Sequence, residues 1–319
     1  MPGPELLTVA KLAPFLMEPL QGAFTVHDRL HEGLMDSATS AFAALAPRIR
    51  AICGSGESKV PAALIAQLPA LEIISIMGVG YDGVDVAAAK TRGVVVTHTP
   101  DVLNDDVADL ALALMLNVAR RIPQAERHVR EGRWPSGPMP LATKMSGARL
   151  GLVGIGRIGQ AIAQRALAFG MSVAYTARSA RPALPYAFHA SPRELAAACD
   201  FLVVITPGGA ATRKLIDASV LEALGPKGYL VNVARGSVVD EAALIAALQK
   251  GTIAGAGLDV TEPEPLPAGH PLWDAPNVII APHIGGAAGP VGVARLSDRA
   301  GANLKRFLAS EPVQHVVRR

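Results

Sequence analysis

The stretch Arg149-Leu-Gly-Leu-Val-Gly-Ile-Gly-Arg-Ile-Gly-Gln160 decides how the rest of this chain is interpreted. It begins with a short apolar run that is typical of a buried strand, and three glycines follow. Gly154 permits a sharp turn, Gly156 lets a phosphate approach the backbone, and Gly159 lets a helix pack closely on the strand. Apolar residues then recur at helical spacing. This order of strand, turn and helix predicts a dinucleotide site with the pyrophosphate at the helix N-terminus.

The composition indicates a globular protein with more than one core. The chain has 319 residues, 50% of them hydrophobic and 18% charged, and its net charge is only +3. A chain of this length is longer than a domain with a single hydrophobic core usually is, so we expect two domains. The basic residues are spread along the chain and are not interleaved with aromatic residues, which argues against nucleic-acid binding.

No segment predicts export or a membrane anchor. The residues Met1–Glu5 lack a basic region, and the longest apolar run, Leu110–Ala119, is too short to span a bilayer. Cys53 and Cys199 lie far apart and without the spacing of metal ligands. We therefore expect a cytoplasmic protein with reduced core cysteines, no membrane contact and no metal.

Short apolar strands alternate with helical segments, which predicts an α/β fold with parallel sheets covered on both faces. In the first part we expect strands at residues 6–10, 49–53, 73–77 and 94–97, and helices at 37–45 and 61–67. One long helical pattern covers residues 104–130. A six-stranded, doubly wound unit follows, with strands at residues 150–153, 172–175, 201–205, 229–233, 254–258 and 278–281. Its helices are expected at residues 158–169, 192–198, 218–224 and 241–249, and a last amphipathic helix at 290–308.

The end of the strand at residues 172–175 indicates which nicotinamide cofactor would bind. Domains that bind NAD place Asp or Glu there to accept hydrogen bonds from the ribose, whereas this chain has Arg178 and Ser179. A guanidinium binds a 2′-phosphate through two hydrogen bonds, and a carboxylate would repel it. The sequence therefore predicts NADP(H); a solvated surface arginine is the alternative.

Arg235, Glu264 and His283 each follow one of the later strands, at the edge of the sheet where the cofactor is expected. Reduction of a 2-oxo acid requires a cation for the carboxylate, which an arginine fork supplies, and a proton for the new hydroxyl, which a histidine delivers near neutral pH. A neighbouring glutamate would favour the imidazolium and fix its tautomer. Taken singly, each residue could be structural, but three at successive strand ends favour catalysis.

With these residues, the chain resembles the D-2-hydroxyacid dehydrogenase family, most closely its branch of glyoxylate/hydroxypyruvate and hydroxyphenylpyruvate reductases. The matching motifs span nearly the whole chain in family order. They are Val79-Gly-Tyr-Asp-Gly-Val-Asp85, Val102-Leu-Asn-Asp-Asp-Val-Ala-Asp109, Leu152-Val-Gly-Ile-Gly-Arg-Ile-Gly159, Val231-Asn-Val-Ala-Arg-Gly-Ser237, Gly257-Leu-Asp-Val-Thr-Glu-Pro-Glu-Pro265 and Pro282-His-Ile-Gly-Gly286.

The resemblance implies a role for each matched residue. Arg235 would bind the substrate carboxylate and carbonyl, His283 would donate the proton, and Glu264, not the nearby Glu262, would be its partner. One departure lies beside them: Thr261 stands where many relatives carry an aromatic residue.

The resemblance also implies the binding residues. The backbone of Val79 and Gly80 would help to bind the substrate carboxylate, and Asp259 would hold the nicotinamide carboxamide. The other cofactor contacts would come from Gly154, Ile155, Gly156, Arg157, Ile158, Gly159, Arg178, Ser179, Thr206, Val233 and Ala234.

The fold implied is a flavodoxin-like substrate domain at residues 1–98 and 285–319 and a Rossmann NADP-binding domain at 99–284. The family forms dimers through the long helix and the loop after it, and Trp134 would either reach the partner's active site or pack locally.

Together these observations predict an NADPH-dependent reductase that converts glyoxylate and hydroxypyruvate to D-2-hydroxy acids. The alternatives are a reductase of bulkier 2-oxo acids such as hydroxyphenylpyruvate, and a non-enzymatic NAD(P)-sensing protein on the same fold. A phosphite- or formate-type oxidoreductase of the superfamily would prefer NAD, which Arg178 disfavours.

Overall fold

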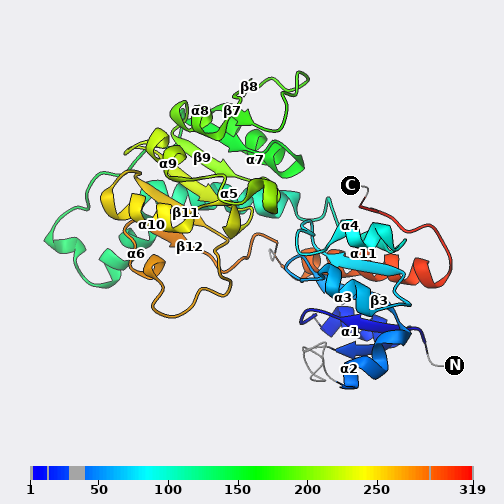
Figure 1. The fold of residues 1–319 in the computed structure, drawn as a ribbon. Coiled ribbons are helices and arrows are strands. Elements are labelled where there is room, and N and C mark those ends of the chain that lie inside the picture. The colour runs from blue at the N-terminus through cyan, green and yellow to red at the C-terminus, as the bar shows by residue number, and fades with distance from the viewer. Residues whose placement is uncertain (1–2, 13, 29–39, 287–288, 318–319) are drawn as a thin grey trace. The chain divides into compact units, whose positions relative to one another are not determined.

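A computed structural model describes residues 3–12, 14–28, 40–286 and 289–317 of the chain (Figure 1). Two compact units are present, residues 1–103 with 287–319 and residues 104–286. Residues 285–286, predicted in the first domain, lie with the second unit, and residues 99–103, predicted in the second domain, lie with the first unit. There Thr99 N donates to Gly78 O, and Gly78 N donates to Thr99 Oγ1, both over 2.9 Å.

The first unit is built on a parallel sheet with the strand order β2-β1-β3-β4-β5. The strands are β1 (Glu5–Thr8), β2 (Thr25–Asp28), β3 (Ile49–Ser55), β4 (Ile73–Met77) and β5 (Val95–Thr97). This is the strand order of flavodoxin-like folds, so the predicted fold class of this unit is confirmed.

Helices cover both faces of this sheet. They are α1 (Pro14–Gln21), α2 (Ser40–Leu45), α3 (Ala62–Gln67), α4 (Val86–Thr91) and α11 (Pro290–Leu308). One core joins Phe42, Leu64 and Ala89 of α2, α3 and α4 to the sheet, and a second core contains Leu20 of α1 and Leu304 of α11. The C-terminal helix α11 therefore completes the N-terminal unit, as its red colour among blue elements shows (Figure 1).

The second unit contains a larger sheet of seven strands with the order β12-β11-β10-β9-β6-β7-β8. The strands are β6 (Arg149–Val153), β7 (Ser172–Thr176), β8 (Ala187–Phe188), β9 (Phe201–Val204), β10 (Tyr229–Asn232), β11 (Gly255–Leu258) and β12 (Val278–Ile280). Counted from β6, the first six strands have the order 3-2-1-4-5-6 of the Rossmann fold, and β12 adds one more strand at the edge. The predicted Rossmann domain is thus confirmed.

Helices also cover both faces of the second sheet. They are α5 (Asn104–Arg120), α7 (Arg157–Ala168), α8 (Pro192–Ala197), α9 (Ala218–Leu224) and α10 (Glu241–Lys250). Helix α6 (Ile122–Arg130) follows α5 and has no buried residue. Leu195, Leu221 and Leu244 place α8, α9 and α10 in one core with the strands. Helix α5 instead packs against α7, β10 and β11.

Short 3-10 helices occur in the connections. They are η1 (Ala46–Arg48), η2 (Trp134–Ser136), η3 (Ala210–Thr212), η4 (Gly236–Val238) and η5 (Pro271–Trp273).

The single helix predicted over residues 104–130 is wrong, because the pattern divides into α5 and α6 at Arg121. Arg121 has a left-handed φ of 53°. Pro123 lacks an N–H and cannot continue the ladder to Ala119 O; Thr143 N donates to that oxygen instead, over 3.0 Å. The helix therefore has to end before the proline.

The strands named from the sequence do not include β2 and β8, and the two helices given as examples for the first unit do not include α1 and α4. The strands β2 and β8 are short edge strands without a fully buried residue, so no apolar run marks them. The helix expected at residues 37–45 is described from Ser40 onward, and residues 37–39 lie outside the described residues.

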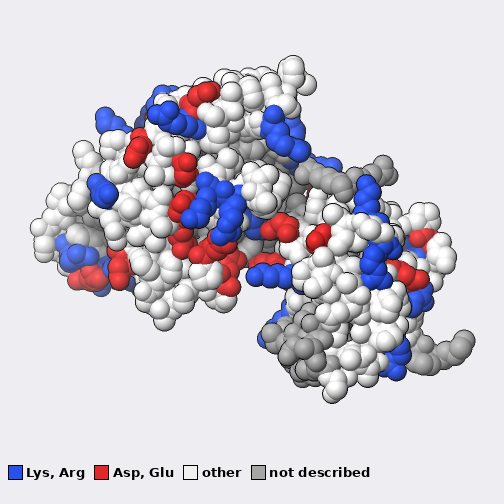
Figure 2. Space-filling model, viewed as in Figure 1, with Lys and Arg blue, Asp and Glu red and all other residues white. Residues whose placement is uncertain are grey.

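Within the described part of the chain, no helix combines the length and the apolar character needed to cross a membrane. The face shown in Figure 2 carries acidic and basic side chains interspersed with large uncharged areas. This distribution agrees with the small net charge of +3.

Both cysteines belong to the cores, which leads to a prediction about their reactivity. Cys53 is 0% exposed and Cys199 4%, and burial raises the pKa of each thiol to about 12. Because only the thiolate reacts, we expect neither cysteine to react with Ellman's reagent in the native protein, and both to react in guanidinium chloride. Rapid labelling of one thiol in the native protein would contradict this placement.

Candidate active site

The glycine turn between β6 and α7 is shaped by close backbone contacts. A Cβ atom at Gly154, where φ is 107°, would lie 2.7 Å from Ile205 O, and one at Gly159 would lie 2.6 Å from Gly154 O. A Cβ at Gly156 would instead meet no atom within 4 Å. Gly156 is also the N-cap residue of α7, whose N-terminus is not capped by a described side chain. The turn thus has an open side beside a helix N-terminus, which suits a phosphate group.

The register of the sheet places the ends of the neighbouring strands beside this turn. One row of paired residues crosses the sheet through Thr176, Val153, Val204, Asn232, Leu258 and Ile280. The residues that follow this row lie at the carboxyl edge of the sheet. Thr206, Val233, Ala234 and Asp259, all predicted from the sequence as cofactor contacts, come one or two positions after it.

The loop after β7 carries the predicted phosphate contacts. Arg178 and Ser179 are exposed at its start. The guanidinium of Arg181 donates from Nη1 to Ile155 O over 3.1 Å, so this side chain lies against the glycine turn. The sequence-based prediction assigned the phosphate contacts to Arg178 and Ser179 and gave Arg181 no role.

A buried amide shapes the loop that presents Arg235. Asn232, only 1% exposed, accepts a hydrogen bond from Ala234 N over 3.1 Å and donates to Arg235 O over 2.9 Å. The next residue, Gly236, contacts the loop after β11, since a Cβ there would lie 2.0 Å from Thr261 O. The Arg235 loop and the loop that carries Glu264 are therefore in direct backbone contact.

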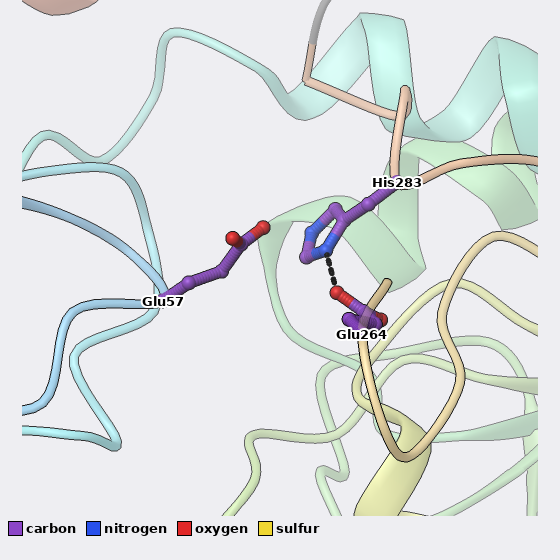
Figure 3. A group of neighbouring side chains, drawn as sticks. All are labelled: Glu57, Glu264 and His283. Atoms are coloured by element: carbon purple, nitrogen blue, oxygen red, sulfur yellow. Dashed lines mark hydrogen bonds and ion pairs between the residues drawn. The ribbon is translucent and has the colours of Figure 1, made fainter. Parts of the chain in front are cut away.

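Glu264 and His283 form a hydrogen-bonded pair (Figure 3). The Nδ1 atom of His283 lies 2.8 Å from Glu264 Oε2, and the other carboxylate oxygen accepts a hydrogen bond from Thr261 N over 2.9 Å. About a quarter of each side chain is exposed, 26% for His283 and 27% for Glu264. Both oxygens of Glu264 are thus engaged, and the imidazole has a defined orientation.

Asp259 holds the turn on which His283 lies. His283 has a left-handed φ of 53°, an uncommon conformation for a residue with a side chain. Ile284 N and Gly285 N donate to the two carboxylate oxygens of Asp259 over 2.8 and 2.9 Å, and His283 N donates to Asp259 O over 2.9 Å. Burial raises the pKa of Asp259, and the two N–H donors partly offset that rise.

Glu262 has different partners from Glu264. Its carboxylate pairs with Arg213 Nη1 over 3.0 Å at an exposed position. Of the two glutamates in this loop, Glu264 is therefore the one bonded to His283.

The remaining predicted residues lie elsewhere in the chain. Val79 and Gly80 follow β4 in the first unit, where Val79 O is 3.0 Å from His98 Nδ1. Trp134 is 68% exposed. The structure thus brings Glu264, His283 and Asp259 together and places the Arg235 loop beside them in the second unit.

Comparisons with known proteins identify the family. The family described as D-isomer specific 2-hydroxyacid dehydrogenase, NAD binding domain, matches residues 112–285. A hydroxyphenylpyruvate reductase of Plectranthus scutellarioides is 44% identical over 84% of this chain and 85% of its own length. A glyoxylate/hydroxypyruvate reductase of Arabidopsis thaliana is 45% identical over 74% of this chain and 75% of its own.

Among solved structures, an NADPH-dependent glyoxylate/hydroxypyruvate reductase of Sinorhizobium meliloti, in complex with NADP and malonate, matches with a TM-score of 0.90. It is 45% identical, and the match covers 98% of this chain and 96% of that one. The chain therefore belongs to the D-isomer specific 2-hydroxyacid dehydrogenase family and is an oxidoreductase of that family.

Proposed function

We propose that this enzyme uses NADPH to reduce glyoxylate and hydroxypyruvate to D-2-hydroxy acids. The observation that carries the proposal is the hydrogen-bonded pair of His283 and Glu264 at the carboxyl edge of a dinucleotide-binding sheet. Two relatives named glyoxylate/hydroxypyruvate reductase support the substrate class, and the one crystallised with NADP supports the cofactor.

His283 would donate the proton to the oxygen of the 2-oxo group. Since its Nδ1 is engaged by Glu264, Nε2 is the ring nitrogen that would face the substrate. The carboxylate of Glu264 orients the ring and stabilises the imidazolium before the proton is transferred. When bound, NADPH supplies the hydride that reaches the oxo carbon.

Arg235 would bind the substrate carboxylate through its planar guanidinium. Its loop is shaped by the buried Asn232 and rests on the Thr261 backbone, so the cation is presented from a defined position. The backbone of Val79 and Gly80 would contribute further N–H groups from the first domain.

The cofactor would be held by the glycine turn and the loop after β7. The open side of Gly156 and the N-terminus of α7 suit the pyrophosphate. Arg178 and Ser179 would bind the 2′-phosphate, with Arg181 adding positive charge beside the turn. Asp259, with Thr206, Val233 and Ala234 on the same edge, would contact the nicotinamide half.

The relative from Plectranthus favours a second candidate, the reduction of hydroxyphenylpyruvate. The sequence identity between this relative and the chain is 44%, close to the 45% of the Arabidopsis glyoxylate/hydroxypyruvate reductase. An NADPH absorbance assay with glyoxylate, hydroxypyruvate and hydroxyphenylpyruvate distinguishes these candidates through their kcat/KM values. Tight NADPH binding without turnover of any of the three acids would instead indicate the sensor.

The role of His283 is tested by His283→Ala. Because a positioned acid contributes about 10²- to 10⁴-fold to such reactions, we expect kcat to fall by about 10²-fold or more. The affinity for NADPH, measured by quenching of protein fluorescence, should stay unchanged. Retention of most of the turnover would mean that the proton comes from another group.

The role of Arg178 is tested by Arg178→Asp. A charge-assisted hydrogen bond contributes about 1.5–3 kcal/mol, so we expect the ratio of kcat/KM for NADPH over NADH to fall by at least about tenfold. Lys250→Asp is a control with the same change in charge, because this residue ends α10, at the opposite edge of the sheet from the glycine turn. An unchanged ratio in Arg178→Asp would refute the assignment.

Two glycine variants separate binding from folding. The methyl group added by Gly156→Ala would have no atom of the chain within 4 Å, so the melting temperature should stay unchanged. The same methyl group would obstruct the pyrophosphate, so we expect NADPH binding to weaken at least about tenfold. Gly159→Ala places a methyl group against Gly154 O, so we expect a loss of about 1–3 kcal/mol in stability. Unchanged NADPH affinity in Gly156→Ala would place the phosphate elsewhere.

A further inference from the structure

We propose that Glu241 and His270 are positioning residues for catalysis, because they hold the loop that carries Glu264. This inference rests on the proposed function and adds two residues that do not touch the reacting atoms. The Glu241 carboxylate is bonded to two donors, the ring atom His270 Nε2 and the backbone N–H of Glu262. We call these three groups the clamp.

The clamp begins at the N-terminus of α10. Glu241 is the first residue of this helix, after the N-cap Asp240. Its Oε2 accepts a hydrogen bond from Glu262 N over 3.3 Å, and its Oε1 lies 3.1 Å from His270 Nε2. One carboxylate therefore ties together two points of the loop that are eight residues apart in the numbering, 262 and 270.

The hydrogen bonds of His270 define how its ring is protonated. Nδ1 accepts a hydrogen bond from Leu272 N over 3.3 Å, so in the neutral ring the proton lies on Nε2 and points at Glu241. Leu272 is 0% exposed and belongs to the core of the second unit. His270 is thus linked to that core through Leu272, and Glu241 is part of α10. The exposed fractions of the two side chains, 15% for His270 and 19% for Glu241, are lower than those of Glu264 and His283.

Glu264 lies between the two points that the clamp holds. It comes two residues after Glu262, whose N–H the clamp holds, and it accepts a hydrogen bond from the N–H of Thr261, the residue before Glu262. Thr261 also donates from Oγ1 to Pro263 O over 2.9 Å, which closes the turn around Glu264. Release of Glu262 N would let this turn move as a unit. The 2.8 Å bond from Glu264 to His283 is sensitive to such a movement, since a misplacement of about 1 Å can cost up to about 10²-fold in rate.

A matched pair of substitutions at one position tests the clamp. His270→Gln places an amide N–H where Nε2 lies and keeps the donor to Glu241. His270→Asn keeps an acceptor for Leu272 N, and with it the local cap, but is too short to reach Glu241. We expect kcat with glyoxylate and NADPH to stay within about twofold in His270→Gln and to fall about tenfold in His270→Asn, with the NADPH affinity unchanged in both. This loss is smaller than the loss expected on removal of the acid itself.

A second readout does not depend on turnover. The ¹⁵N chemical shifts of the His283 ring, assigned with His283→Ala and measured at alkaline pH, show which nitrogen carries the proton. The Nδ1–H form should persist in the native protein and in His270→Gln, and should give way to a mixture of tautomers in His270→Asn and in Glu241→Gln.

The outcomes separate the two proposals. If the native protein reduces no 2-oxo acid, the proposed function fails, while the ring shifts still test the clamp. If the native protein is active but His270→Asn and Glu241→Gln keep both its kcat and its ring shifts, the clamp is refuted. Equal losses in His270→Gln and His270→Asn would also refute it, because the donor to Glu241 would then be irrelevant.

Discussion

The second unit depends on the close approach of α7 to the end of β6. The contact is between backbone atoms, at Gly159 and the carbonyl of Gly154, and a Cβ atom would prevent it. Because the helix begins immediately at the strand end, its N-terminus lies at the carboxyl edge of the sheet. The parallel register then brings the loops after β9, β10, β11 and β12 to the same edge. A bound dinucleotide and the residues that act on the substrate can therefore lie together at the carboxyl edge of the sheet.

Polar side chains that are buried or half-buried, and not further strands, shape the loops at that edge. Asn232 bonds to the backbone before Arg235, Asp259 bonds to the backbone after His283, and Glu241 bonds to the backbone before Glu264. A buried polar group without partners costs about 1–3 kcal/mol, so Asn232 and Asp259, which are 1% and 3% exposed, favour the loop conformations that satisfy them. The left-handed φ of His283 is maintained by such bonds.

The sequence was most informative where a pattern of residues is compatible with only one kind of secondary structure. Apolar runs identified the central strands of both sheets, because strands buried on both faces contain few polar residues. Edge strands such as β2 and β8 bury one face at most and were missed. The division between α5 and α6 was also missed, although Pro123 marks it, because the apolar helical pattern continues on both sides of the break.

The sequence by itself predicted the dinucleotide turn and made Arg235, Glu264 and His283 the candidate catalytic residues, because each follows a recognisable strand and has a chemistry that few residue types can supply. The family resemblance already named Glu264, and not Glu262, as the partner of His283, and the structure contains this bond. Only the tertiary structure revealed Arg181, Asn232, Glu241 and His270. Asn232 bonds within its own loop, whereas Arg181, Glu241 and His270 make contacts between segments that follow different strands. Ile155 lies 26 positions from Arg181 and His270 lies 29 positions from Glu241, and no periodicity links these partners. Distances of that kind are set by the sheet, which aligns strand ends whatever the number of residues between them.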